Sequence, residues 1–280
     1  MNGAAREAIV LPDAAALAEA AAQRLIGYLL ERQSWRSPVH VALTGGHTGI
    51  AVLEHARSNA LLGAVSWPDI HFWWGDERFV PADSPDRNDV QARRALLDHL
   101  PEPSGGVHPA ATAGTGVSLA DAARRYTAEL RRHHVVFDLV LLGVGPDGHV
   151  ASIFPESAGA AGLAAAAGTA AAGQPPPKRP AEAPKAATAS DKEPAAQAAA
   201  STPAAFAVAD SPKPPPERVS LTLPTICAAR EVWLVAAGEP KRAAARRALT
   251  GPPDPALPAS LVQGRDRTLW FLDADAAAPA

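Results

Sequence analysis

Apolar positions along the chain fall into two spacings, and their alternation predicts helices and strands in turn. From residue 14 to about residue 32 apolar side chains recur at helical spacing, and Asp13 precedes them as an N-cap. Short runs that are almost wholly apolar follow at 39–43, 70–74 and 137–142. Strands that are apolar on both faces are typical of buried parallel sheets. The pattern therefore predicts an α/β fold with a mostly parallel sheet and helices on both faces.

The alternation of predicted helices and strands continues through the rest of the chain. A helix is expected over 50–58, after a glycine-rich turn, and another over 119–130, capped by Ser118 with Asp121. Further strands are expected in the second half of the chain, at 218–223, 231–236 and 268–272.

One segment, at about 157–205, breaks this pattern. It consists mainly of Ala, Pro, Gly, Ser and Lys and has almost no large apolar side chain. Such a segment cannot bury enough apolar surface to offset an ordering entropy of about 1–2 kcal/mol per residue. We expect a disordered or mobile insertion within a single domain that spans residues 1–280. The alternative is a linker between two domains, but the chain from Phe206 to Ala280 is too short and strand-poor to close its own sheet.

Net charge, cysteine content and the length of the apolar runs limit the classes of function that this chain could have. The formal net charge of −3 gives no general attraction to nucleic acid or anionic lipid, so an anionic substrate would need a local cluster of cations. The single cysteine, Cys227, excludes an intramolecular disulfide and fits a reducing compartment. Residues 1–11 lack the features of a secretory signal, and no apolar run reaches the roughly 18 residues of a membrane span. We expect a cytoplasmic globular protein, a monomer or weak homo-oligomer, that binds neither nucleic acid nor membranes.

The first cluster that could carry chemistry is the turn 44–49, which directly follows a predicted strand. Its candidate ligand-binding residues are Thr44, Gly45, Gly46, His47 and Thr48. Glycines let backbone N–H groups approach a ligand, and the following helix adds the positive end of its dipole, which suits a phosphate. A tight turn without a ligand is an equally good interpretation. The turn has neither the Gly-Lys-Ser/Thr ending of a P-loop nor the Gly-x-Gly-x-x-Gly of a dinucleotide site.

The second cluster, Asp76-Glu77-Arg78, directly follows the apolar run 70–74. Ligands of open parallel sheets bind at the carboxyl ends of strands. Charged residues here therefore indicate a ligand-binding site more strongly than charged residues on a helix surface do. Arg78 could hold an anion or stabilise developing negative charge. The alternative is a surface ion-pair cluster. Phe72, Trp73 and Trp74 are expected in the core rather than in a sugar-stacking platform.

The third cluster is the glycine-rich turn 143–149, which places His149 two residues after Asp147. An imidazole with an ordinary pKa of about 6.5 can take a proton from water at neutral pH, and a carboxylate can orient it. The alternative is a capping His at a helix start. No Gly-x-Ser-x-Gly elbow exists, and His133-His134 follows a helix without spaced carboxylate or cysteine partners, so no metal site is expected.

Taken in order, these clusters resemble the 6-phosphogluconolactonase family. The segments that carry the resemblance are 43–48, 74–81, 84–88, 138–155 and 210–224, and the similarity covers nearly the whole chain outside the insertion. The chain departs from the family at His47, where Ser is usual, and at Gly49, where Pro is usual. His47 could still donate to a phosphate, and Gly49 is expected to make the turn more flexible.

The resemblance implies a Rossmann-like fold related to glucosamine-6-phosphate deaminase and ribose-5-phosphate isomerase. It implies hydrolysis of 6-phospho-D-glucono-1,5-lactone to 6-phospho-D-gluconate in the oxidative pentose phosphate pathway, with no cofactor and no metal. His149 would be the general base, and Arg78 would bind or polarise the lactone. The resemblance also gives Asp76 and Asp147 supporting roles. Phosphate would be held by the glycine turn together with two cations, Arg218 and Lys241.

The chemistry of these residues and the family resemblance fit the same mechanism. A water molecule activated by His149 attacks directly, and Arg78 and backbone N–H groups stabilise the oxyanion. The nearest rival is an isomerase or deaminase acting on an amino sugar phosphate. Those relatives usually carry Asp-Glu-Tyr and Asn-Gly-His where this chain has Asp76-Glu77-Arg78 and Asp147-Gly148-His149, so both differences favour the lactonase. A non-catalytic sugar-phosphate sensor on the same scaffold is a third hypothesis.

Overall fold

A seven-stranded parallel sheet forms the centre of the protein in the computed structural model, which describes residues 6–155 and 203–279. The strand order is β1-β10-β9-β6-β2-β3-β5, and every neighbouring pair runs parallel. The strands are β1 (Arg6–Leu11), β2 (Val39–Leu43), β3 (Ile70–Trp74), β5 (Gly106–Val107), β6 (Leu139–Gly143), β9 (Glu231–Ala236) and β10 (Arg267–Asp273). The predicted fold class is confirmed. Most of the predicted insertion at about 157–205 lies outside the described residues.

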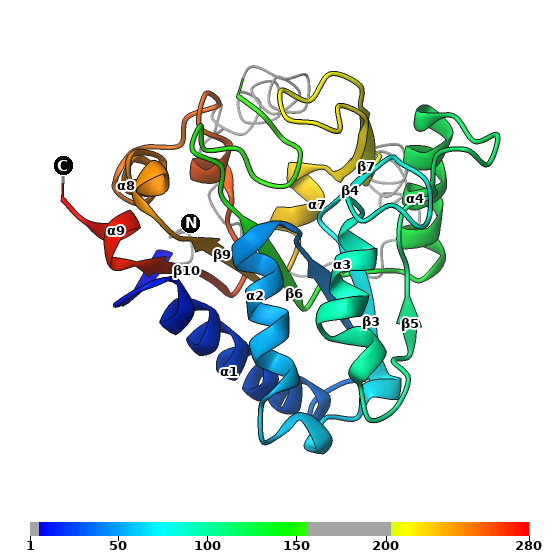
Figure 1. Ribbon diagram of the computed structural model, residues 1–280, viewed down its shortest axis with the longest axis horizontal. Helices are drawn as coiled ribbons and strands as arrows, with labels where there is room; N and C mark the ends of the chain where they lie inside the picture. Colours follow the sequence, from blue (N-terminus) through cyan, green and yellow to red (C-terminus); the bar gives the residue numbers. More distant parts are fainter. Residues whose placement is uncertain (1–5, 156–202, 280) are drawn as a thin grey trace, which may run out of the picture.

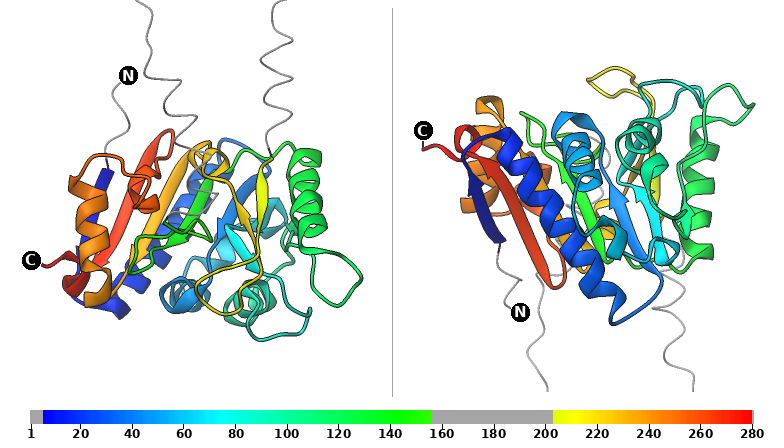
Figure 2. Two further views of the ribbon diagram at one scale, coloured as in Figure 1. Left: turned by 90° about the horizontal axis from the view of Figure 1, so that it is seen from above. Right: turned by 60° about the horizontal axis from the view of Figure 1, so that its bottom comes forward.

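Helices cover both faces of this sheet. The long helix α1 runs diagonally across the strands, and α2 and α3 lie side by side (Figures 1 and 2). The α-helices are α1 (Ala14–Gln33), α2 (Gly46–Arg57), α3 (Asn88–Ala95), α4 (Leu119–Arg132), α7 (Leu223–Cys227), α8 (Arg242–Thr250) and α9 (Ala274–Ala277). Short 3-10 helices occur at η1 (Leu62–Ala64), η2 (Trp67–Asp69), η3 (Leu97–His99), η4 (Glu239–Lys241) and η5 (Pro258–Leu261). The predicted caps are confirmed, since Asp13 accepts from Ala16 N–H and Ser118 from Asp121 N–H.

Alternate residues of each strand enter opposite halves of the core. Phe72 and Trp74 pack on the side of α1, α2 and α3, whereas Trp73 packs on the side of α4, α7 and α8. All three side chains are buried, as expected for core residues rather than a sugar-stacking platform. Within the described ranges, none of the helices is both apolar and long enough to span a bilayer.

A second, three-stranded antiparallel sheet lies against the first, in the order β4-β8-β7. It consists of β4 (Asp76–Arg78), β7 (Ala205–Val208) and β8 (Arg218–Leu221). Two expectations are corrected here. The predicted strand 218–223 ends at Leu221 and belongs to this second sheet, because Leu223 already begins α7. Asp76–Arg78 is a strand rather than only a turn, since β8 pairs with it.

Candidate active site

The glycine turn after β2 forms one wall of the site. Helix α2 begins at Gly46 rather than at the predicted residue 50, and Gly46 has φ 80°, which favours glycine. Gly49 therefore lies inside the helix and not in a loop. A Cβ on Gly49 would come within 2.5 Å of the Thr44 methyl, so this glycine allows a close approach of the turn to the helix. The result places the backbone N–H groups at the start of α2 beside a cavity.

The turn after β6 presents the predicted base. Gly145 N–H donates to the carbonyl of His149 at 2.9 Å, and Gly148, at φ 82°, closes the turn. His149 Nδ1 lies 2.5 Å from Asp147 Oδ1. Nε2 has no hydrogen-bond partner among the described residues. The ring also packs on Phe154, with centroids 4.6 Å apart. Because Asp147 binds Nδ1–H, it leaves the Nε2 lone pair available to accept a proton, as the carboxylate does in hydrolytic triads.

Burial and charge act in opposite directions on this pair. Burial lowers the pKa of His149 below its ordinary value, and the hydrogen bond and charge of Asp147 oppose that fall. Burial raises the pKa of Asp147. The hydrogen bond to His149 and the electrostatic interaction with that ring lower the pKa by more, so the net shift is downward. At neutral pH the pair therefore consists of a neutral imidazole and a carboxylate, which is the form a general base requires.

Strand β4 supplies Asp76 and Arg78, which differ in exposure and partners. Asp76 is buried, accepts the Ser152 hydroxyl at 2.6 Å and lies 3.6 Å from the Arg218 guanidinium. Arg78 is half-buried and donates through one terminal nitrogen to the Asp86 carbonyl at 2.5 Å. Its Nε is buried without a hydrogen-bond partner in the described chain. Asp76 is thus held by neighbouring side chains beside the site, whereas the guanidinium of Arg78 has only a backbone acceptor among the described residues and borders the same cavity.

The carboxylate between them, Glu77, ties β4 to the start of α3. It accepts the backbone N–H groups of Arg78, Asn88 and Asp89 at 2.7, 2.7 and 2.9 Å. It also lies 3.6 Å from the buried guanidinium of Arg87. This network fixes Asn88, whose side-chain amide donates to the Asp76 carbonyl at 2.7 Å.

Arg218 and two lysines, Lys213 and Lys241, also bring positive charge to the site. Arg218 is buried and donates to the carbonyls of Pro215 and Lys213 at 3.1 and 2.9 Å, so it holds the loop that carries Lys213. Burial lowers the pKa of Lys241, the like charge of Lys213 lowers it further, and Asp147 opposes both. The ammonium groups of Lys213 and Lys241 therefore lie near each other, and that of Lys241 lies near Asp147.

These walls enclose a cavity of about 370 Å³. Every predicted ligand-binding residue lines it, as do the predicted Asp76, Arg78 and His149, while Asp147 reaches it through His149. Asn88 and Lys213 also line the cavity and were not predicted as site residues. Both stand in segments that carry the family resemblance, 84–88 and 210–224, but their side chains reach the site only through the packing of β4 and β8.

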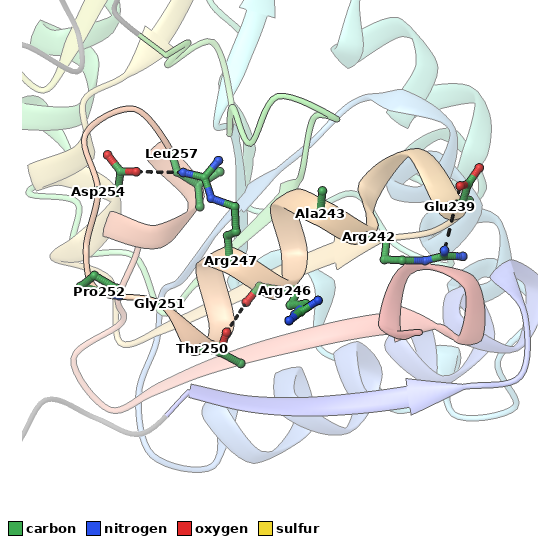
Figure 3. A pocket seen from close by; sticks show the side chains of 10 residues that line it. All are labelled: Glu239, Arg242, Ala243, Arg246, Arg247, Thr250, Gly251, Pro252, Asp254 and Leu257. Atoms are coloured by element: carbon green, nitrogen blue, oxygen red, sulfur yellow. Dashed lines mark hydrogen bonds and ion pairs between the residues drawn. The ribbon is translucent and has the colours of Figure 1, made fainter. Parts of the chain in front are cut away.

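A larger hollow of about 540 Å³ lies over α8 (Figure 3). Two of its three arginines already have acidic partners, since Arg247 lies 3.0 Å from Asp254 and Arg242 lies 4.0 Å from Glu239. Its lining contains no histidine or glycine turn at the end of a strand. The smaller cavity, and not this one, combines a base, cations and a helix N-terminus.

Comparison with known proteins places the chain among sugar-phosphate enzymes. Residues 12–183 and 188–270 match the family model described as glucosamine-6-phosphate isomerases/6-phosphogluconolactonase. A 6-phosphogluconolactonase of Streptomyces coelicolor is 40% identical over 279 residues, covering 96% of this chain and 92% of that protein. The crystal structure of 6-phosphogluconolactonase from Thermotoga maritima matches with a TM-score of 0.72 and 25% identity, covering 96% and 99% of the two chains. A monomeric glucosamine-6-phosphate deaminase shares the fold, with a TM-score of 0.69 and 18% identity over 97% and 99%.

Proposed function

This chain belongs to the glucosamine-6-phosphate isomerase/6-phosphogluconolactonase family, and from that premise we propose that it is a 6-phosphogluconolactonase. It hydrolyses 6-phospho-D-glucono-1,5-lactone to 6-phospho-D-gluconate, the second reaction of the oxidative pentose phosphate pathway. The observation that carries the proposal is the His149–Asp147 pair, whose ring borders the same cavity as Arg78 and the glycine turn.

The reaction begins with a water molecule between His149 and the lactone carbonyl. Nε2 takes a proton from the water as its oxygen forms a bond to the carbonyl carbon, and the carbonyl electron pair moves onto oxygen. Arg78 stabilises this oxyanion through its guanidinium, because the residue borders the same cavity as His149. When the carbonyl re-forms, the bond to the ring oxygen breaks and the imidazolium returns its proton to that oxygen. The carboxylic acid product then ionises in water.

The substrate phosphate requires a second anion site in the same cavity. Lys213, Lys241 and the backbone N–H groups at the start of α2 supply positive charge and donors there. Arg218 contributes to this site by holding the Lys213 loop and by facing the cavity. We infer that the phosphate binds near the lysines and the start of α2, and that the lactone carbonyl binds near His149 and Arg78.

A lactonase assay on the purified full chain tests the proposal. The lactone is generated in place by a dehydrogenase, product formation is followed through a second dehydrogenase, and spontaneous hydrolysis is subtracted. We expect turnover by the wild type and a fall in kcat of about 10²–10⁴-fold in His149→Ala, with only a modest change in KM. Normal turnover in His149→Ala would refute the role of His149. Ammonia release from glucosamine 6-phosphate, without lactonase activity, would assign the chain to the deaminase branch instead.

A further inference from the structure

Three histidines gather on the side of the sheet that α4 covers, apart from the catalytic cavity. His71 lies on β3, His108 directly follows β5, and His133 caps the C-terminus of α4. A ring nitrogen from each lies within 4.8 Å of a ring nitrogen from both others. None of the three lines the cavity around His149, and His71 precedes Trp74 at the strand end by roughly 10 Å of strand.

Two of the ring nitrogens lie close to the spacing that a small ion requires, and the third lies within 4.8 Å of both. His71 Nδ1 and His108 Nε2 are 2.9 Å apart, joined by a shared proton. Ligand nitrogens of a tetrahedral zinc site at 2.0–2.1 Å from the metal are about 3.3 Å apart. An ion can therefore replace the shared proton if the two rings separate by a few tenths of an ångström. His133 Nε2 is buried and makes no hydrogen bond within the described chain, although Glu129 Oε1 lies 3.2 Å away.

Glu129 supplies the carboxylate that such a site needs. It lies one turn before His133 on the same face of α4, and its Oε1 is 3.2 Å from His108 Nδ1. A carboxylate that accepts Nδ1–H fixes the imidazole tautomer and directs the Nε2 lone pair toward the metal, an arrangement that recurs at zinc sites. The sequence-based interpretation that His133 lacks a spaced carboxylate partner is therefore wrong.

Gly106 keeps the space between the two nearest nitrogens clear. It pairs with His71 across β3 and β5, and a Cβ there would lie 2.3 Å from His108 Nε2 and 2.8 Å from His71 Nδ1. No side chain can occupy this position without pushing the rings apart. Trp73 stacks on the His108 ring with centroids 4.0 Å apart and holds it from the other side.

The end of α4 favours a cation at this cluster. His133 stands at the C-terminal end of α4, where the helix dipole is negative and stabilises positive charge.

We propose that His71, His108 and His133 bind one divalent transition-metal ion of the zinc type, with Glu129 orienting His108. Imidazole ligands select zinc, cobalt, nickel or copper over magnesium or calcium. Three protein ligands leave a fourth position for water. The ion joins β3, the segment after β5 and the end of α4, so its expected effect is stabilisation of this edge of the sheet.

Titration of the metal-free full chain with CoCl₂ tests the site, because the visible absorption of Co²⁺ distinguishes tetrahedral imidazole ligation from the hydrated ion. We expect one Co²⁺ per chain, displaced by Zn²⁺, and a rise in Tm of about 5 °C with Zn²⁺ at about one hundred times Kd. His133→Ala should weaken binding at least tenfold. Gly106→Ala should do the same without removing a ligand.

Two control variants test whether the ion binds at this cluster and whether its binding is independent of turnover. His55→Ala removes an exposed histidine on α2 and should leave Co²⁺ affinity unchanged. His149→Ala should lower kcat by about 10²–10⁴-fold but retain the ion, so failure of the metal site and failure of the proposed function are distinguishable. Absence of tetrahedral Co²⁺ absorption and of any Zn²⁺-dependent Tm rise in the wild type would overturn the proposal. Wild-type affinity in a folded His133→Ala would also overturn it, leaving the cluster as a hydrogen-bonded packing motif.

Discussion

Asp147 holds His149 from within the same tight turn, with Oδ1 2.5 Å from the ring Nδ1. Residues so close in sequence lose little chain entropy on meeting, and Gly145 and Gly148 give the backbone the shape that brings them together. The base and the group that orients it are thus a local unit, while Arg78 and the lysines arrive from distant segments.

The pH dependence of turnover should report this pair. Because burial lowers the pKa of His149 below about 6.5, kcat/KM should be flat at neutral pH and fall only in acid. Asp147 raises that pKa against burial, so Asp147→Asn should move the acid limb to lower pH. It should also lower the plateau at least about tenfold, because the tautomer is no longer fixed. The measurement is a kcat/KM profile, with Asp266→Asn, which alters an ion pair near the start of β10, as control. An unmoved acid limb would contradict the coupling.

An exposed lysine and a buried arginine should contribute to phosphate binding in different ways. Lys213→Ala should raise KM for the phosphorylated lactone about 10–100-fold with unchanged Tm, because an exposed charge contacts the ligand. Arg218→Ala should raise KM and also lower Tm, since the guanidinium holds two carbonyls of the Lys213 loop and neighbours Asp76. Steady-state kinetics and thermal unfolding measure both effects, with Arg246→Ala on α8 as a charge-matched control. If Lys213→Ala leaves KM at its wild-type value, the phosphate lies elsewhere.

Gly145 should tolerate no side chain. A Cβ there would lie 2.0 Å from His149 Nδ1 and 2.4 Å from Asp147 Oδ1, so Gly145→Ala must displace the ring. We expect kcat to fall about 10²-fold, since misplacing a catalytic group by about 1 Å has that effect. Thermal stability should change less than kcat, because Pro146 and Asp147 at the tip of the turn are exposed and can shift. Gly27→Ala, in α1 where a Cβ meets nothing within 4 Å, should keep full activity. Full activity in Gly145→Ala as well would show that the ring geometry is not needed.

Glu77 should be essential for stability rather than chemistry. Its removal leaves three backbone N–H groups and the Arg87 guanidinium without their shared acceptor. Glu77→Ala should therefore lower the free energy of unfolding by about 3–5 kcal/mol, as breaking buried ion pairs does. Denaturant unfolding measures this, with the exposed Glu102→Ala as control. A loss below about 1 kcal/mol would show that the network relaxes around the missing carboxylate.

The amino-acid sequence by itself determined the local elements and the chemistry of the strand ends. Apolar runs predicted β2, β3, β6 and β9 because a buried strand needs apolar side chains on both faces. Asp13 and Ser118 marked helix starts because their side chains satisfy N–H groups close along the chain. The turn with Asp147 and His149 was predictable for the same reason, since the contact between these two side chains is local.

Only the tertiary structure decided which residues far apart in the sequence contact each other. Strand β1 is half exposed and lacks a buried apolar run, and it forms because Arg6 to Leu11 pairs with β10 more than 250 residues later. Lys213 and Asn88 reach the cavity only because β8 pairs with β4 and Glu77 anchors α3. His71, His108 and His133 are likewise far apart in sequence and meet across the sheet edge. A sequence pattern records the burial and the local conformation of each residue, but contacts between remote residues arise only when the sheet orders its strands.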